Sequence, residues 1–266
     1  MIAELAPAKL YSASLQAGLG LISECGELLA LWQPGMSARS LYQTALDAGR
    51  FPGMTARRLR NLVMEGFAPR FLVNAAAPAR LLKPLVASLP AVDLGQIFLL
   101  YTLRAHPILA DFLVQVYWPR YAAGDAALSN DPARAFVEQA VDAGRTRVRW
   151  SPATARRVAA YLTGCCADFG LLEAVERSSK RFTSFRPRDA LMAWLAYDLH
   201  GRGVGDSQIP EHPEWACFGL DSHAVVDELR RLALRDLLIV QSSGELVEIA
   251  WTHRNSEGLC HVLARI

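Results

Sequence analysis

Apolar residues recur at helical spacing along most of the chain, and this pattern predicts a mainly α-helical fold. Near the N-terminus, for example, Leu15, Leu19 and Ile22 follow this spacing up to a stop at Pro34-Gly35. Spacing and capping residues together predict helices over 12–32 (or 14–32), 37–48, 56–67, 76–88, 92–104, 107–121, 131–143, 152–169, 187–200 and 222–235.

Two pairs of short apolar runs flank polar tips and predict two β-hairpins. The predicted strands are 171–175 with 182–185 around the basic tip 176–181, and 238–241 with 246–250 around the tip 242–245. Each hairpin follows a helix, and this order is typical of a winged helix-turn-helix. The segment 145–150, just before the first of these helices, alternates charged with other residues and predicts a short strand or an extended turn.

These elements divide the chain into three predicted parts. An all-helical domain covers 1–126 and contains a candidate helix-turn-helix over 37–67. A winged helix-turn-helix covers 127–186, and a second winged-helix-like unit covers 187–266. A chain of 266 residues is long enough for two or three such units.

Positive charge gathers in the first winged unit and directly after it. Between Arg145 and Arg188 the chain has ten basic and three acidic residues, a net charge of +7, whereas the whole chain carries +2. A near-neutral protein with its positive charge concentrated in this way is expected to meet nucleic acid. The candidate DNA-binding residues are Arg147, Arg149, Thr154, Arg156, Arg157, Arg177, Lys180 and Arg181, and on the helix 56–67 Arg57, Arg58 and Arg60.

Each group of candidates has a predicted role. The helix that begins at Ser151-Pro152 is expected to place Arg156 and Arg157 in the major groove, where its free amides also favour phosphate. The hairpin tip is expected to lie along the neighbouring backbone or minor groove. For all these residues, the 57–60 group included, the alternative is a solvated basic face without a ligand. The arginines of the second winged unit have neighbouring acids that offset them, so no DNA contact is expected there.

Catalytic and metal-binding motifs are absent from the sequence. It has no Walker A loop, no Gly-x-Gly-x-x-Gly after a strand, no Gly-x-Ser-x-Gly and no His-Glu-x-x-His. The five cysteines lack ligand spacing, so we expect a reducing, cytoplasmic compartment, no structural metal and no cofactor. Glu211-His212-Pro213-Glu214 places carboxylates beside an imidazole, which favours a loop salt bridge over a metal or acid–base site.

The charge spacing also argues against a membrane protein. The longest stretch without a charged residue, 10–23, has 14 residues, whereas a spanning helix needs about 20 apolar residues. The first seven residues contain Glu4 and no basic region of the kind that opens a secretory signal.

Three segments of the chain resemble the BrxA family of BREX phage-exclusion systems. Tyr11-Ser12-Ala13-Ser14-Leu15 and the helix after it resemble the opening of that family, and the Ala105–Leu113 segment resembles the start of its central helix. The stretch Trp150–Pro187 resembles its C-terminal winged part, and the likeness covers roughly 11–200. The resemblance implies an all-helical protein with winged helix-turn-helix character that binds double-stranded DNA and has no enzyme activity. It also implies a place beside a methyltransferase, an ATPase and a phosphatase-like protein.

Charge, element order and resemblance together predict a non-enzymatic double-stranded DNA-binding accessory protein of a phage-defence system. One alternative is a scaffold whose winged units bind other defence subunits and never touch DNA. Another is a transcriptional regulator of the defence operon, which shares the fold. The dependence of affinity on salt separates the first two, and a preference for one DNA sequence separates the third.

Overall fold

The computed structural model is mainly α-helical, as the apolar pattern predicts, and it describes residues 10–17, 21–175, 179–243, 246–253 and 256–263. Up to residue 122 its helices are α1 (Ile22–Leu31), α2 (Ala38–Asp47), α3 (Ala56–Asn61), α4 (Ala68–Phe71), α5 (Ala77–Leu82), α6 (Ala91–Ala105), α7 (Pro107–Phe112) and α8 (Trp118–Ala122). Short 3-10 or π-helical segments precede or join them at Ala13–Ala17, Leu62–Phe67, Lys83–Ala87 and Leu113–Tyr117.

The rest of the chain combines helices with two small sheets. Its elements are β1 (Ala127–Ser129), α9 (Asn130–Asp142), α10 (Pro152–Asp168), β2 (Leu172–Ala174), β3 (Ser179–Phe182), α11 (Asp189–Gly201), α12 (Ser222–Ala233), β4 (Ile239–Ser243), β5 (Leu246–Ala250) and α13 (Ser256–Leu263). Two 3-10 segments, Asp206–Gln208 and Pro213–Phe218, lie between α11 and α12. The strands β4 and β5 pair antiparallel at the place predicted for the second hairpin, whereas α13 has no counterpart among the predicted helices.

Side-chain caps predicted from the sequence begin several helices. Ser37, Thr55 and Ser151 each accept a hydrogen bond from the backbone N–H three residues further on, at 3.1, 3.3 and 3.2 Å. Asp221 accepts the corresponding bond at 2.8 Å. Such a cap satisfies one of the amides that the first turn of a helix leaves without an intrahelical partner. Local sequence signals are therefore sufficient to place these helix starts.

The prediction of one continuous helix over 12–32 is wrong. Leu21 has φ 42, in the left-handed region, and α1 begins only at Ile22. A short 3-10 segment, Ala13–Ala17, precedes it. A left-handed residue interrupts the regular hydrogen-bond pattern of a helix, so the apolar spacing continues across two separate elements.

The first hairpin is shifted from its predicted position. Its second strand, β3, is Ser179–Phe182 rather than 182–185, and it lies between β1 and β2 in an antiparallel sheet of order β1-β3-β2. The sequence has little signal for β1, because Leu128 is its one buried residue. Lys180 pairs with Leu128 on one side and with Ala174 on the other. Pairing with two neighbours, rather than an apolar pattern of its own, makes this basic segment a strand.

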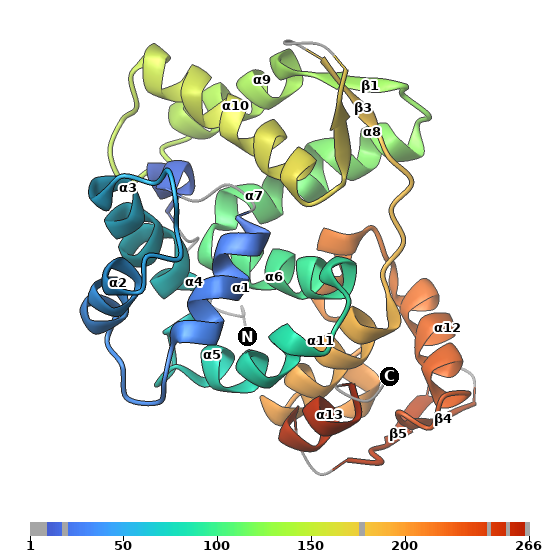
Figure 1. Cartoon of the computed structure of the whole chain (residues 1–266). Helices are drawn as coiled ribbons and strands as arrows, with labels where there is room; N and C mark the ends of the chain where they lie inside the picture. Colours follow the sequence, from blue (N-terminus) through green and yellow to red (C-terminus); the bar gives the residue numbers. More distant parts are fainter. Residues whose placement is uncertain (1–9, 18–20, 176–178, 244–245, 254–255, 264–266) are drawn as a thin grey trace, which may run out of the picture.

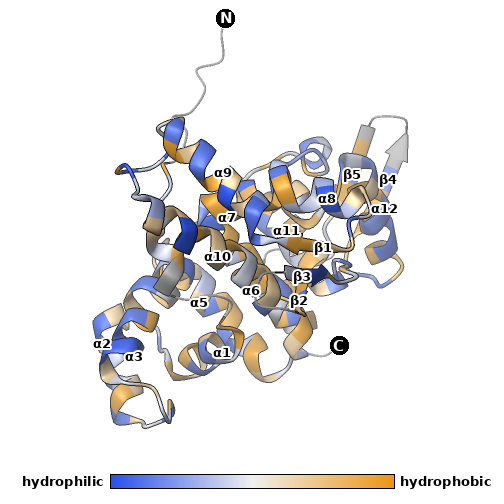
Figure 2. Ribbon diagram, turned by 90° about the horizontal axis from the view of Figure 1, so that it is seen from above, coloured by the Kyte–Doolittle hydropathy of each residue, from blue (hydrophilic) through white to orange (hydrophobic). Residues whose placement is uncertain are grey.

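The helices α6 and α11 form the centre of the core. Every residue of α6 from Asp93 to Leu103 is buried, and Trp194 of α11 donates a hydrogen bond to the Tyr101 hydroxyl of α6 at 3.2 Å. Figure 1 shows α1–α5 on one side of this pair, the unit from β1 to β3 above it, and α12 with β4 and β5 at the lower right. In Figure 2, hydrophilic residues alternate with hydrophobic ones along outer helices such as α2 and α9.

Within the described part of the chain, no single helix is long and apolar enough to cross a membrane. Ala91–Ala105 and Pro107–Ala122 meet that test of length and composition only as a pair, and the pair is bent by 109°.

Candidate nucleic-acid interface

One face of α10 is open to solvent over the first half of the helix. The exposed residues of this face are Ala153, Arg156, Arg157 and Ala160, which are spaced as neighbours on one side of a helix. On the opposite side, residues such as Val158 and Leu162 are buried, and α10 packs mainly on α9. Neither arginine forms an ion pair with a described residue, and the side chains beside them are methyl groups. Arg156 and Arg157 are therefore exposed to solvent beside small side chains.

The helix start is well ordered by its cap. Ser151 holds the amide of Thr154, and the Ser151 and Thr154 hydroxyls lie 3.1 Å apart. Thr154 is only half-exposed, so its side chain belongs partly to the cap.

The segment before α10 is an extended turn, which is one of the two predicted forms. A single parallel bridge joins Thr146 to Tyr11, and Trp150 is buried at the other end. Between these two anchors Arg147 and Arg149 are exposed. Arg149 lies 3.4 Å from the equally exposed Asp142, and a pair of this kind restrains a side chain only weakly.

Arg145 is held within the fold and adds little to the free positive charge of this region. Its guanidinium lies 2.8 Å from Asp111 Oδ2 and stacks on the Tyr11 ring, with 4.5 Å to the ring centroid. The Tyr11 hydroxyl donates to the same carboxylate at 2.5 Å. Burial and the hydrogen bond to Asp111 raise the pKa of Tyr11. Arg145 thus fixes the start of the turn to α7 and to the N-terminal segment.

The predicted basic hairpin tip needs correction. Lys180 and Arg181 lie in β3 rather than at the tip, because the strand begins at Ser179. Lys180 Nζ donates to Thr163 Oγ1 on α10 at 3.1 Å. Arg181 lies 2.5 Å from Glu173, its neighbour on β2. Arg177 falls outside the described residues.

The arginines of α3 form a separate group. Arg57, Arg58 and Arg60 are all exposed, and none of them forms an ion pair within the described ranges. Figure 1 shows α3 at the left of the molecule and the hairpin β2–β3 at the upper right, with α10 running between these two sides. The three predicted basic groups therefore do not meet at one point.

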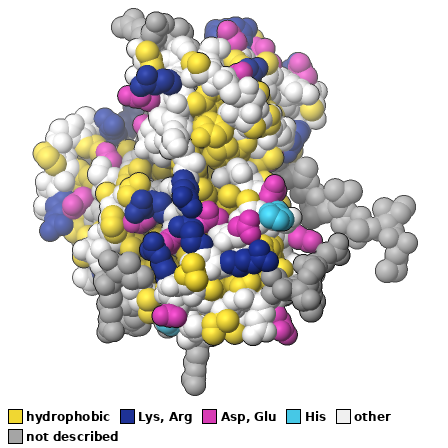
Figure 3. Space-filling view, turned by 90° about the vertical axis from the view of Figure 1, so that its right-hand side faces the viewer, with side chains coloured by type: hydrophobic (Ala, Val, Ile, Leu, Met, Phe, Trp, Pro, Cys, Tyr) yellow, Lys and Arg dark blue, Asp and Glu magenta, His cyan; other side chains and the backbone are white. Residues whose placement is uncertain are grey.

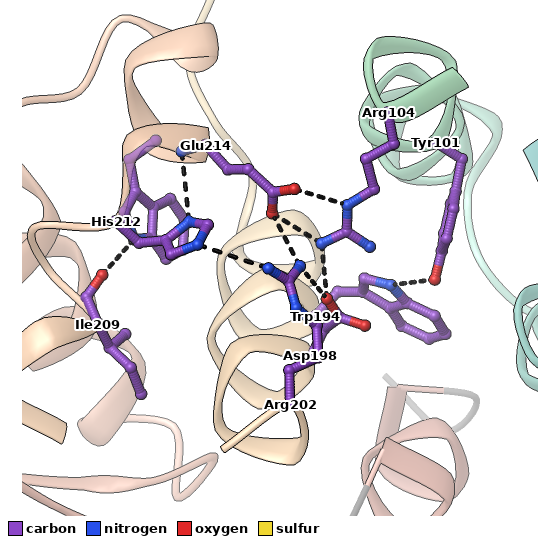
Figure 4. Close-up of polar contacts among 9 residues, drawn as sticks. Tyr101, Arg104, Trp194, Asp198, Arg202, Ile209, His212 and Glu214 are labelled. Carbon is purple, nitrogen blue, oxygen red and sulfur yellow. Dashed lines mark hydrogen bonds and ion pairs between the residues drawn. The ribbon is translucent and has the colours of Figure 1, made fainter. Parts of the chain in front are cut away.

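Four ionisable residues form a network that sequence spacing does not reveal, here called the central ion network (Figure 4). Arg104 of α6 donates to Asp198 at 2.6 Å and to the two oxygens of Glu214 at 2.9 and 2.7 Å. Arg202 lies 3.3 Å from Asp198 and 3.4 Å from Glu214. The predicted loop salt bridge is therefore confirmed for Glu214, and its partners are Arg104 of α6 and Arg202, directly after α11.

The electrostatics of the central ion network favour a structural role. Burial would raise the pKa of Glu214, but the hydrogen bonds and charge of Arg104 outweigh it and hold that pKa below its usual value. Burial lowers the pKa of the adjacent His212. Two guanidinium groups meet two carboxylates, so the charges balance. Among the residues that the structure describes, no group of three or more His, Cys, Asp or Glu could hold a metal ion.

The chain is similar to a protein family and to a solved structure. The family model described as BrxA matches residues 9–197. No curated protein sequence matches the chain. The crystal structure of an uncharacterized protein from Magnetospirillum magneticum has a TM-score of 0.56 and 16% identity, and the match covers 78% of this chain and 97% of that one. This likeness shows a shared fold, while the family match includes α10 and the first hairpin.

Proposed function

This chain belongs to the BrxA family, which is associated with BREX defence against bacteriophages, and we propose that it is a double-stranded DNA-binding accessory protein of such a system. The proposal makes it non-enzymatic and cytoplasmic, and gives it other BREX subunits as partners. The unit from β1 to β3 is the proposed reader of DNA.

The topology of this unit supports its interpretation as a winged helix-turn-helix. A strand and two helices, β1, α9 and α10, precede the hairpin β2–β3, and β3 pairs with both other strands. In such modules the second helix enters the major groove and the hairpin lies beside it. Here α9 and α10 pack on each other, and β2 follows α10 directly. In this arrangement α10 is the recognition helix.

The single observation that carries the proposal is the exposed pair Arg156 and Arg157 in the first turns of α10. Their guanidinium groups have no carboxylate partner among the described residues, so a phosphate or a base edge would not have to displace one. A guanidinium offers several N–H donors in a planar fork, which suits both ligands. The positive end of the helix dipole lies at the same place and adds to the attraction for phosphate.

The proposal is tested by measuring binding to a duplex of random sequence at several salt concentrations. The wild type should bind with a log–log salt slope of about −0.9 per phosphate contact. The variant Arg156→Ala/Arg157→Ala should lose affinity and have a slope shallower by about 1 to 2. Loss of base-edge contacts would cost on the order of 1–3 kcal/mol each.

A matched control removes the same charge elsewhere. Arg80→Ala/Arg230→Ala deletes two exposed arginines on α5 and α12 and should bind DNA like the wild type. Circular dichroism of each variant checks folding, because arginine stems also pack. Equal affinity of the wild type and the Arg156→Ala/Arg157→Ala variant would remove α10 as the reader. Absence of binding by the folded wild type would favour the scaffold instead.

A further inference from the structure

A pocket of about 400 Å³ opens where the start of α6, the segment before α11 and the end of α12 meet. Its lining includes four arginines and two aspartates together with proline and leucine side chains. The charged lining residues are Arg186, Arg188, Arg231, Arg235, Asp93 and Asp189. We call this set the arginine pocket. Its four arginines come from two stretches of sequence more than forty residues apart, which explains why no local pattern reveals it.

The ion pairs of the arginine pocket are asymmetric. Arg188 pairs with Asp93, Arg231 and Arg235 pair with Asp189 at 2.7 and 2.6 Å, and Arg186 lies 3.5 Å from Glu228. The arginine side chains are 32–70% exposed, whereas their carboxylate partners are only 9–17% exposed. The carboxylates therefore lie beneath the arginines, and the surface of the pocket presents mainly guanidinium groups.

A surface ion pair on α12, outside the pocket, lacks this asymmetry. On α12, Arg230 lies 3.0 Å from Asp227, and the two side chains are 52% and 55% exposed. Such a pair presents both charges equally to an approaching ligand. By charge alone, the sequence makes Arg230, Arg231 and Arg235 equivalent. The structure distinguishes them, because the carboxylate partners of Arg231 and Arg235 are buried. These partners are Asp189 and Glu228.

This arrangement prepares the arginines to bind an anion. For Arg186, Arg188 and Arg235, a buried carboxylate occupies part of the guanidinium and fixes its position, while the remaining N–H donors stay available. All three guanidinium nitrogens of Arg231 contact Asp189 or Glu228, so this residue contributes mainly its charge. Side chains that are already ordered lose less conformational entropy on binding. Charge-assisted hydrogen bonds from guanidinium to phosphate are among the stronger polar contacts in proteins.

The arginine pocket is close to the proposed DNA reader along the chain. Arg186 follows the last residue of β3, Phe182, by four residues, and these span at most about 14 Å when fully extended. Figure 1 shows this connection running down the right-hand edge of the molecule from β3 to α11. Figure 3 looks onto that side and shows arginine or lysine side chains gathered near its centre, with acidic ones between them.

We propose that the arginine pocket binds the phosphodiester backbone of the same duplex that α10 reads, and so extends the DNA-binding surface from the winged unit to α12. The proposal rests on the proposed function. One turn of duplex is about 34 Å long, so a duplex lying along the hairpin reaches past the connection 183–188 within about half a turn. Phosphate contacts of this kind position the protein and carry no sequence information.

The test compares a double substitution in the pocket with a single substitution on α12. Arg186→Gln/Arg235→Gln removes two outward guanidinium groups of the pocket, while Arg230→Gln removes one whose carboxylate is equally exposed. Fluorescence anisotropy with a random duplex of about three turns, at several salt concentrations, is the measurement. The double variant should have a salt slope shallower by about 1.8 and an affinity lower by on the order of tenfold or more at 0.1 M salt. Arg230→Gln should match the wild type.

A second variant guards against misfolding. Arg186 is the most exposed member of the pocket, at 70%, and its partner is 3.5 Å away, so Arg186→Gln alone should leave the melting temperature unchanged. It should still make the salt slope shallower by about 1. An unchanged slope in this folded variant and in the double variant overturns the proposal.

The remaining outcomes identify which statement fails. If the wild type binds no DNA, the proposed function fails first. If Arg156→Ala/Arg157→Ala weakens binding but the pocket variants bind normally, only the pocket proposal fails. Equal losses for Arg230→Gln and the pocket variants would indicate a general charge effect and also overturn it. Calorimetry with inorganic phosphate alone tests whether the pocket binds a free anion instead of DNA. Saturable millimolar binding that is lost in Arg186→Gln/Arg235→Gln, while the DNA affinity of this variant is unchanged, would assign the pocket to a free anion.

Discussion

The unit built on α10 and the unit built on α12 each place an antiparallel hairpin after a pair of helices, and they differ in where their charges lie. Each helix begins at a side-chain cap, Ser151 or Asp221, and leads to an antiparallel hairpin. The first turns of α10 carry exposed arginines, whereas the amides at the start of α12 already face the carboxylate of its cap. We therefore expect a phosphate to be attracted to the first helix start and repelled from the second.

Arg231, near the other end of α12, and Arg235, just after it, lie in a different setting. Arg231 and Arg235 are tied to Asp189 of α11 and so help to join two helices. A similar order of helices and strands therefore does not imply the same mode of DNA contact. The position of each charge along its helix, and the burial of the acid beside it, decide what the helix can bind.

Charge reversal in the first turns of α10 should have the largest effect. Arg156→Glu/Arg157→Glu is expected to weaken binding to random duplex at 0.1 M salt by about 100-fold, because phosphate contacts are lost and like charges are introduced. Ser222→Glu/His223→Glu, in the first turn of α12, should leave the affinity nearly unchanged. Anisotropy titrations measure both, and similar losses in the two variants would show that the comparison is wrong.

Removal of an arginine should affect stability very differently in the central ion network and in an exposed pair on α9. Arg104→Ala leaves Asp198 and Glu214 without their strongest partner in a partly buried site and should lower the free energy of unfolding by about 2–3 kcal/mol. Arg134→Ala breaks the exposed pair with Glu138 on α9 and should have no measurable effect. Urea denaturation gives both values. If the two variants are equally stable, the central ion network does not hold α6 to α11.

Acid should destabilise the whole fold through His106, and with it the units built on α10 and α12 alike. This histidine lies at the bend between α6 and α7. Burial, aided by the positive charge of Arg70, lowers the pKa of His106 from 6.5 to about 3. The unfolded chain binds the proton more readily, so this contribution to stability is complete above pH 6.5 and is lost as the pH falls towards 3. The expected loss between pH 6.5 and 5.5 is about 1 kcal/mol. In His106→Leu this part of the acid dependence should disappear, and denaturation measured across pH checks it.

The smallest effect is expected on the hairpin. Glu173 lies 2.5 Å from Arg181, and both side chains are exposed. Glu173→Gln removes a negative charge beside the proposed DNA path and should tighten binding about two- to threefold at low salt, with the gain lost as salt rises. The substitution should not alter the melting temperature. Unchanged affinity at every salt concentration would indicate that the duplex does not pass β2.

Most helices could be predicted from the sequence because their signals are local. Ser37, Thr55 and Ser151 each occur where a periodic apolar pattern begins, and each caps its helix. The exposure of Arg156 and Arg157 follows from the same periodicity.

Features that depend on distant partners could not be predicted in this way. The strand β3 exists through pairing with β1, about fifty residues earlier, and its own residues are mostly polar. Arg145 looks like part of the basic window until the structure places it against Asp111. The arginine pocket depends on Asp93 and Glu228, which lie far from Arg188 and Arg186 in the sequence. Charge counting along the chain cannot show which member of an ion pair is buried.

The sheet order β1-β3-β2 also has a consequence for synthesis. The two outer strands, β1 and β2, pair with β3 and not with each other, and β3 is the last of the three to leave the ribosome. A nascent chain that ends before Ser179 therefore carries two strand edges without their common neighbour, and unpaired edges of this kind invite association with other chains. The four residues Ser179–Phe182 complete the unit in a single step late in translation. Products truncated just before them should accumulate as aggregates rather than as partly active protein.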